Sequence, residues 1–207
     1  MDEDIPLRCR DILRRHYAFI EYREFFCCRV ITPLTPGEAI RRIGMRENDL
    51  LPAAGHDTSA EEGCLLIGQV GPAVVTFDQN GTGRFLRNAE ALTKGCDHGM
   101  AHWDFYNLTF AYRCRDGSGG GWDGESRDLE EMPDPVAALR AGPLAPYAGL
   151  FARAVEMFDA GEDDDVDPVV YLQAVMLTVL ELETGVRVDD GLIDGLPHAV
   201  HVPASLR

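Results

Sequence analysis

Residues 64–86, CLLIGQVGPAVVTFDQNGTGRFL, carry the signals that decide the fold. Two apolar runs are separated by Val70-Gly71-Pro72, and a second turn signal, Asn80-Gly81, follows the second run. Apolar runs bounded by Gly, Pro and Asn-Gly pairs are typical of antiparallel hairpins. The stretch therefore predicts two adjacent antiparallel strands joined at Gly71.

Further strands are expected on both sides of this hairpin. Residues 27–32, CCRVIT, form one short strand, and residues 95–117, GCDHGMAHWDFYNLTFAYRCRDG, contain two more. The glycine-rich residues 116–126, DGSGGGWDGES, predict a flexible connector lying over one edge of the sheet. Successive strands joined by short turns indicate an antiparallel β-meander.

Several helices are expected around this sheet. In three of them an oxygen-bearing cap precedes proline at the first helical position, and glycine ends the helix. These pairs of start and stop signals are Thr35-Pro36 with Gly44, Asp134-Pro135 with Gly142, and Asp167-Pro168 with Gly185. Apolar periodicity predicts two more helices, over residues 5–17 and 146–159. The helix over 168–184 is apolar on nearly every side, so we expect it to be buried at the centre.

These elements predict an α+β fold, in which an antiparallel β-meander sheet is packed on one side by helices. We expect a single domain, because 207 residues are enough for one hydrophobic core. Its core should span residues 25–193. A basic amphipathic helix should lie within residues 1–24, and residues 194–207 should form an irregular tail.

The chain is acidic, with a formal net charge of −16. Basic and acidic residues balance within residues 1–50, so the remainder carries the whole excess. Such a field repels nucleic acid and anionic membranes and attracts basic proteins. The N-terminal MDEDIP indicates no secretory signal, and the apolar stretch 169–180 is too short to span a bilayer. We therefore expect a cytoplasmic protein with reduced cysteines, with neither nucleic acid nor a membrane as partner.

Residues 95–117 also contain side chains that can bind metal or carry out catalysis. A metal site would need Cys96, His98 and His102 to converge, with Asp104 or Cys114 as the fourth ligand. The spacing C-x-H-x3-H matches no strong zinc pattern, and Cys114 falls on the buried face of its strand. Cys96 could instead be a nucleophile with His98 or His102 as its base. The favoured interpretation is structural, so we expect neither a metal nor a cofactor.

Four segments occur in a recognisable order: CRVITPLTPGEAIRRIGM, LIGQVGPAVVTFDQNG, NLTFAYRCRDG and ELETGVRVDDGLI. Over residues 25–193 they resemble an uncharacterised domain family of actinobacteria, a domain-of-unknown-function group with an LTPxEAxRRxG … NG … DG … TGVR pattern. The shared motifs are caps, turns and core positions, so the resemblance implies a fold and carries over no catalytic residue. Pro72-Ala73-Val74 stands where that pattern has a tryptophan. Lys94 is the only lysine among 19 basic residues, which is typical of a GC-rich bacterial genome.

Two functions are compatible with these observations. The first is a regulatory or immunity-type binding module whose acidic surface engages a basic protein partner. Its candidate contacts are Glu125, Asp128, Glu130, Glu131, Asp163, Asp164 and Asp165. The alternative is a small enzyme with an acid–base site at His102, Asp104 and His98, over which Trp122 would close. That alternative predicts a pocket in which His102 has a carboxylate within hydrogen-bond reach.

Overall fold

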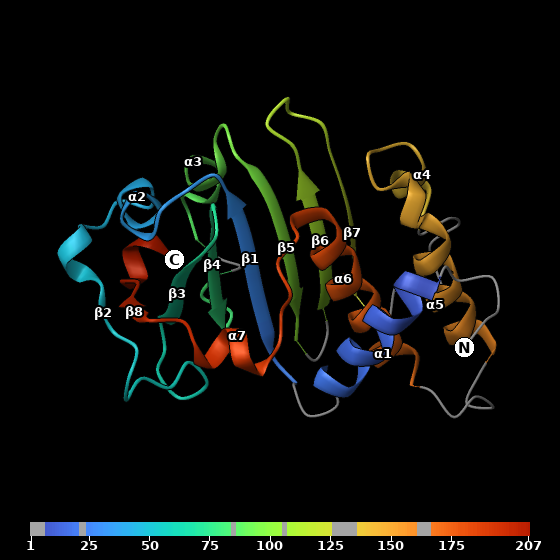
Figure 1. Cartoon of the computed structure of the whole chain (residues 1–207), viewed down its shortest axis with the longest axis horizontal. Coiled ribbons are helices and arrows are strands. Elements are labelled where there is room, and N and C mark those ends of the chain that lie inside the picture. The colour runs from blue at the N-terminus through green and yellow to red at the C-terminus, as the bar shows by residue number, and fades with distance from the viewer. Residues whose placement is uncertain (1–6, 21–23, 84–85, 105–106, 126–135, 161–166) are drawn as a thin grey trace.

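In a computed structural model, the chain folds around one antiparallel sheet (Figure 1). The structure describes residues 7–20, 24–83, 86–104, 107–125, 136–160 and 167–207. Within these ranges the strands are β1 (Phe26–Thr32), β2 (Leu51–Pro52), β3 (Cys64–Val70), β4 (Ala73–Asp78), β5 (Asp97–Trp103), β6 (Asn107–Arg113), β7 (Gly119–Glu125) and β8 (His198–His201). Their order across the sheet is β2-β8-β3-β4-β1-β5-β6-β7, and every neighbouring pair is antiparallel. The predicted α+β class is confirmed.

The helices differ greatly in length. The long ones are α1 (Leu7–Ile20), α5 (Ala148–Ala160) and α6 (Pro168–Thr184). The short ones are α2 (Pro36–Arg42), α3 (Ala89–Thr93), α4 (Ala137–Arg140) and α7 (Asp190–Asp194), with 3-10 turns at Glu47–Asp49, Ala145–Tyr147 and Ala204–Leu206. The sequence predicted α1, α2, α5 and α6 from their caps and periodicity. Asp134 and Pro135, the predicted start of the α4 segment, lie outside the described residues.

The sheet separates two hydrophobic clusters because alternate side chains of a strand face opposite sides. On β1, Phe26 and Val30 belong to the larger cluster, which includes side chains of α1, α5 and α6. Ile31 belongs to the smaller cluster, which includes side chains of α2 and α3. The long helices thus cover one face, and the short α2 and α3 pack against the other.

Helix α6 is the centre of the larger cluster, as its apolar sequence predicted. Asp167 caps it by accepting a hydrogen bond of 2.8 Å from the Val169 amide. Gly185 ends it with a φ of 71°, a left-handed conformation that favours glycine. On β5, Gly99 allows α6 to approach the sheet closely, because a Cβ at that position would collide with the side chain of Leu180.

Helix α1, the described part of the predicted N-terminal helix, packs directly on α6. Arg15 donates two hydrogen bonds to Glu181, of 2.9 and 2.8 Å, and His16 Nε2 lies 3.0 Å from Glu181 Oε2. Burial lowers the pKa of His16 to about 4, although the Glu181 carboxylate opposes this effect. The N-terminal helix is therefore part of the main hydrophobic cluster.

Two segments differ from their predicted structure. The glycine-rich connector forms strand β7, in which Gly121 pairs with Ala111 of β6. Gly121 lies so close to the carbonyl oxygen of Phe110 that a Cβ would not fit. The predicted irregular tail contains β8, which lies between β2 and β3 in the sheet. In both cases backbone hydrogen bonds to a neighbouring strand form the element, and these are weakly encoded in the local side-chain pattern.

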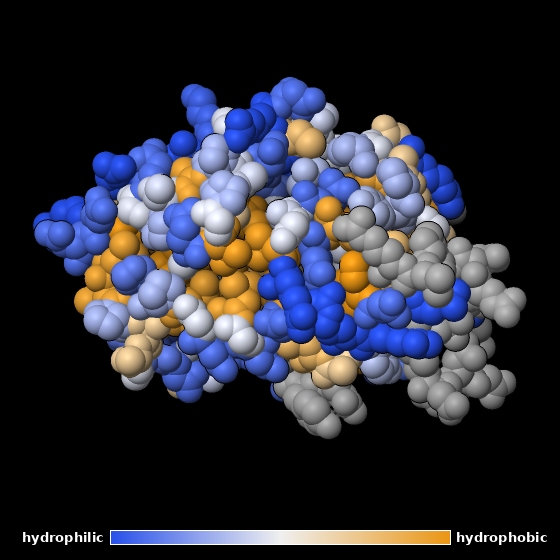
Figure 2. All heavy atoms as spheres, in the orientation of Figure 1, coloured by the Kyte–Doolittle hydropathy of each residue, from blue (hydrophilic) through white to orange (hydrophobic). Residues whose placement is uncertain are grey.

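The surface on the α6 side is divided between polar and apolar regions (Figure 2). Hydrophilic residues cover α1, whereas hydrophobic residues gather over β3, β4 and β1 beside α6. The layer of long helices thus lies mainly over the β5–β7 half of the sheet. None of the helices in the described ranges is long and apolar enough to cross a membrane.

Candidate metal site

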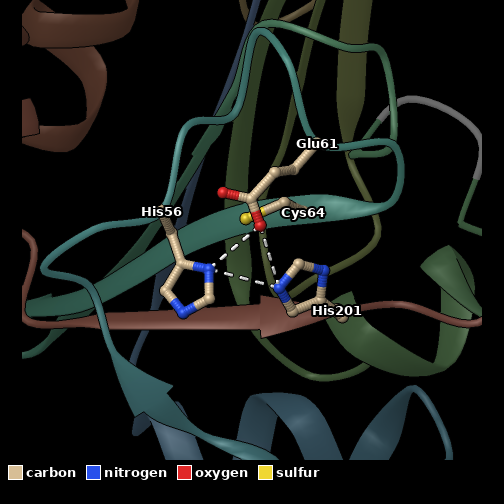
Figure 3. Close-up of side chains that lie close together, drawn as sticks. All are labelled: His56, Glu61, Cys64 and His201. Atoms are coloured by element: carbon tan, nitrogen blue, oxygen red, sulfur yellow. Dashed lines mark hydrogen bonds and ion pairs between the residues drawn. The ribbon is translucent and has the colours of Figure 1, made fainter.

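Four side chains that can bind metal gather where β3 begins and β8 ends: His56, Glu61, Cys64 and His201 (Figure 3). His56 and Glu61 lie in the segment between β2 and β3. Cys64 is the first residue of β3, and His201 is the last residue of β8. Within the described ranges, this is the group whose ligand atoms come together closely enough to hold one ion.

The distances between the ligand atoms match those expected around a single small cation. His56 Nδ1 lies 3.1 Å from Glu61 Oε2, His201 Nε2 lies 3.3 Å from the same oxygen, and the two ring nitrogens are 3.2 Å apart. Ligands at about 2.0 Å from a tetrahedral zinc ion are separated by about 3.3 Å. Cys64 Sγ completes the group, all of whose ligand atoms lie within 4.8 Å of one another.

Protons can bond at most two edges of the triangle formed by these two nitrogens and one oxygen. A ring nitrogen presents either one N–H or one lone pair in the plane of its ring. If both histidines donate to Glu61, their two N–H groups converge on one oxygen, and the two ring nitrogens, 3.2 Å apart, have no hydrogen bond between them. If His201 instead donates to His56, the lone pair of His56 Nδ1 is used and cannot bond Glu61. A cation accepts a lone pair from all three atoms at once.

The pairing of β3 with β8 brings residues from distant parts of the chain into this site. Cys64 and His201 are direct cross-strand neighbours, so their side chains lie on the same face of the sheet. Gly63 has a φ of +81°, and a Cβ there would lie 2.7 Å from Val202 O. The Val202 amide donates a 2.8 Å hydrogen bond to Gly63 O. Glycine at this position therefore lets the segment before β3 lie close to β8.

Neighbouring residues hold the ligands in position. Glu61 Oε1 accepts a 2.7 Å hydrogen bond from the Asp57 amide, which leaves Oε2 directed at the two histidines. The Asn80 side-chain amide donates to Glu61 O at 2.8 Å and to Cys64 O at 2.7 Å. Such outer partners orient metal ligands and raise metal affinity. Asn80, which the sequence predicted as a turn residue, thus also joins two ligand-bearing residues.

The site combines a buried thiol with partly exposed ligands. Cys64 is fully buried, whereas the exposed fractions of the His56, Glu61 and His201 side chains are 23, 33 and 42 %. Burial, followed by the charges of Glu61, Asp78 and Asp57, raises the pKa of Cys64 to about 11. The Asp57 amide, followed by His56, lowers the pKa of Glu61. An ion can therefore reach the site from solvent through its three partly exposed ligands.

The candidates predicted from residues 95–117 are placed differently. His102 Nε2 lies 3.5 Å from Asp104 Oδ2, so this predicted pair is close. His98 Nε2 instead lies 3.2 Å from Arg29 Nη1, and Cys96 Sγ lies 3.5 Å from both Pro33 O and Arg42 Nη1. The proposed Cys96 metal or nucleophile site is therefore not assembled in the described structure.

His98 and His102 are both buried on the face of β5 that lies against Arg29 and Cys27 of β1. Burial, together with the positive charges of Arg29 and Arg113, lowers the pKa of His98 to about 3. The cavities described on the protein are not lined by His98, His102 or Asp104. The enzyme hypothesis at these residues stays a prediction.

The acidic contacts predicted for a basic partner fall in segments whose side chains are outside the described part of the chain. Glu125 ends β7 and its backbone pairs with Asn107, but its side chain and that of Trp122 are not among those described. The remaining contacts, Asp128, Glu130, Glu131, Asp163, Asp164 and Asp165, lie outside the described residues.

The sequence did not predict this group of four candidate ligands, because the fourth residue is remote from the other three. His56, Glu61 and Cys64 fall within nine consecutive positions, in a pattern H-x4-E-x2-C that could have drawn attention. His201 is 145 residues from His56, in a segment predicted to be irregular. Only the position of β8 beside β3 brings it to the other ligands.

Comparison of the chain with protein-family models, with curated proteins and with solved structures found no match. The resemblance to an actinobacterial domain family therefore stays a prediction. The function must be argued from the site itself.

Proposed function

We propose that this protein binds a zinc ion through His56, Glu61, Cys64 and His201. The observation that supports this most strongly is the triangle of His56 Nδ1, His201 Nε2 and Glu61 Oε2, with edges of 3.1 to 3.3 Å. Imidazole, thiolate and carboxylate together suit a borderline cation such as Zn²⁺, whereas Mg²⁺ and Ca²⁺ prefer oxygen ligands alone.

The ion would have a structural role. Four protein ligands fill a tetrahedral shell, and closed shells of this kind are typical of structural sites. Here the ion would join the segment before β3 to the end of β8, at the edge of the sheet where β2 contributes only two residues. Zinc binding would therefore stabilise the folded state, by an amount that grows with the logarithm of the ratio of free zinc to the dissociation constant.

Metal analysis of the purified protein tests this proposal, followed by calorimetric titration of the chelator-treated protein with Zn²⁺. One equivalent of zinc should bind the wild-type chain, and His201→Ala should weaken binding by at least a hundredfold. His198→Ala is the matched control, because His198 lies on the same strand outside the cluster and its replacement should leave zinc binding unchanged. Equal zinc affinity in all three proteins would refute the proposal.

The net charge of −16 supports a second candidate function, the binding of a basic protein partner. Attraction between opposite charges speeds association and is screened by salt. A partner captured at low ionic strength should therefore carry a net positive charge and dissociate as salt is added. Capture that is insensitive to salt would count against this function.

A further inference from the structure

A second candidate site lies at the opposite end of the sheet. Cys64 and His201 lie at the end of the sheet where β4 terminates. The register through β1 shows that β5 terminates at this same end. The second site is a cavity of about 510 Å³ beside the N-terminal end of β5. It lies between α3, the link from α3 to β5, and the turn that joins β6 to β7.

Basic side chains dominate the charged lining of this cavity. Arg87, Lys94, Arg113 and Arg115 line it together with one carboxylate, that of Glu90. The lining thus carries a net positive charge on a chain whose net charge is −16, and it includes the only lysine. Cations gathered in a cleft concentrate anions there, even when the protein as a whole is acidic.

Contacts within the fold hold these basic residues in place. Arg113 ends β6 and pairs with His98 of β5. The Arg115 amide donates a 2.8 Å hydrogen bond to Asp97 Oδ1, and Arg87 Nε donates a 2.6 Å hydrogen bond to the carbonyl of Arg207. Arg42 Nη1 donates to Lys94 O at 2.9 Å, which fixes the backbone of the lysine. These contacts fix the backbones of Lys94, Arg113 and Arg115 beside the cavity, and the guanidinium of Arg87 as well.

Two glycines leave space for a ligand to approach the backbone. Gly95 and Gly117 both line the cavity, with φ values of +69° and +87°. No atom lies within 4 Å of the position that a Cβ would occupy on either residue. The positive φ accounts for glycine at both turns, and the open space beside them leaves the backbone accessible to a ligand.

We propose that this cavity binds a small organic phosphate, a phosphomonoester whose phosphate group contacts Arg113 and Lys94. Guanidinium groups bind phosphate oxygens with paired hydrogen bonds, and an ammonium group adds a point charge. A volume of about 510 Å³ exceeds the needs of inorganic phosphate and lies within the range of small-molecule sites. A long polyanion would extend beyond the Debye length of about 8 Å and meet the acidic remainder of the surface.

Calorimetric titration at physiological salt tests this proposal, with AMP and glycerol 3-phosphate as probes and adenosine, glycerol and inorganic phosphate as comparisons. At least one of the two esters should bind. Its affinity should be tenfold or more above that of its neutral counterpart, and also above that of inorganic phosphate. Arg113→Gln and Lys94→Gln should each weaken that binding about tenfold. Arg153→Gln, which removes the same charge from α5, should leave it unchanged.

The outcomes that would overturn the proposal are distinct. If neither ester produces heat of binding at millimolar concentration, the site is excluded. It is also excluded if Arg153→Gln loses as much binding as Arg113→Gln and Lys94→Gln. Equal affinity for inorganic phosphate and both esters would show that the cavity holds no organic group. Because phosphate also binds metal ions, the titration is repeated with His201→Ala. Retained binding there would support the cavity, and lost binding would assign the phosphate to the metal site and overturn the proposal. Thermal melts establish that each variant is folded.

Discussion

His56 Nδ1 and His201 Nε2 lie 3.2 Å apart, although 145 residues separate the two histidines in the sequence. Two ring nitrogens at this distance share an oxygen of Glu61, and the thiol of Cys64 lies beside them (Figure 3). The relationship depends on β8, a four-residue strand that places the last part of the chain inside the sheet. The proposed zinc ion would therefore join the two segments whose contact is least evident from the sequence.

Removal of the metal should destabilise the protein. A ligand at a hundred times its dissociation constant stabilises the folded state by about 2.7 kcal/mol. Thermal melts with Zn²⁺ and with chelator should therefore differ by several degrees in the wild-type chain, and the difference should disappear in His201→Ala. A chelator-induced shift of the same size in His201→Ala would show that zinc acts elsewhere.

Asn80→Ala should weaken zinc binding without removing a ligand. The Asn80 amide bridges the backbone carbonyls of Glu61 and Cys64. Partners that contact the ligating groups directly change metal affinity about 10- to 100-fold, so we expect a loss of up to about 10-fold for this backbone contact. The control is Asn88→Ala, since Asn88 also donates to a carbonyl, that of Ile43, but lies outside the site. Competition titration with a zinc-binding dye measures both. The same affinity in the two variants would contradict a positioning role for Asn80.

Stability should fall in acid because of His16. The pKa of His16 is lowered by burial to about 4 in the folded chain, against 6.5 for the ordinary side chain. The unfolded chain therefore takes up the proton first as the pH falls. The contribution of neutral His16 to the free energy of unfolding is complete above about pH 6.5. It declines between pH 6.5 and 4 and is lost below pH 4. Its full size is about 3 kcal/mol.

Urea unfolding of the wild-type chain and of His16→Gln over this pH range measures the contribution. Other titrating groups contribute equally to both proteins where the substitution does not affect them. Their contributions therefore cancel in the difference between the two unfolding free energies. That difference should shrink as the pH falls from 6.5 to 4. A difference that stays constant with pH would show that His16 is not held in its neutral form.

Arg29→Met should destabilise the fold by about 2 kcal/mol or more. The buried guanidinium of Arg29 donates to Gly83 O through Nε at 2.9 Å and through Nη2 at 2.7 Å. Its replacement would leave that carbonyl buried without these donors. Arg41→Met is the control, since the Arg41 side chain is 59 % exposed and its loss should change stability by less than about 0.5 kcal/mol. Equal unfolding free energies for the two variants would contradict a structural role for Arg29.

Local signals predicted much of the fold. Gly71 marks the turn between β3 and β4, Thr35 caps α2, and Asp167 and Gly185 bound α6. Each of these features depends on residues within a few positions of one another. Strand β7 was missed because three consecutive glycines, 119–121, pair through their backbones without a side-chain pattern. Strand β8 was missed because four residues are too few to show a period.

The candidate site was less predictable than the fold, for a physical reason. Three ligands occur close together in the sequence, but a metal site is defined by the distances between ligand atoms. Those distances depend on the register that pairs Cys64 with His201, which is a property of the assembled sheet. The histidines of residues 95–117 drew more attention because they are close in sequence, yet His98 and His102 are directed into buried contacts of β5.

The measurement that tests the zinc site most directly is the absorption spectrum of the chelator-treated protein after addition of Co²⁺. Co²⁺ occupies zinc sites and reports both their geometry and the presence of a thiolate ligand. The wild-type chain and the Cys114→Ser control should show tetrahedral d–d bands with a thiolate charge-transfer band, and Cys64→Ser should lose the charge-transfer band. The weak spectrum of hydrated Co²⁺ in the wild-type chain, or an unchanged charge-transfer band in Cys64→Ser, would contradict the proposed site.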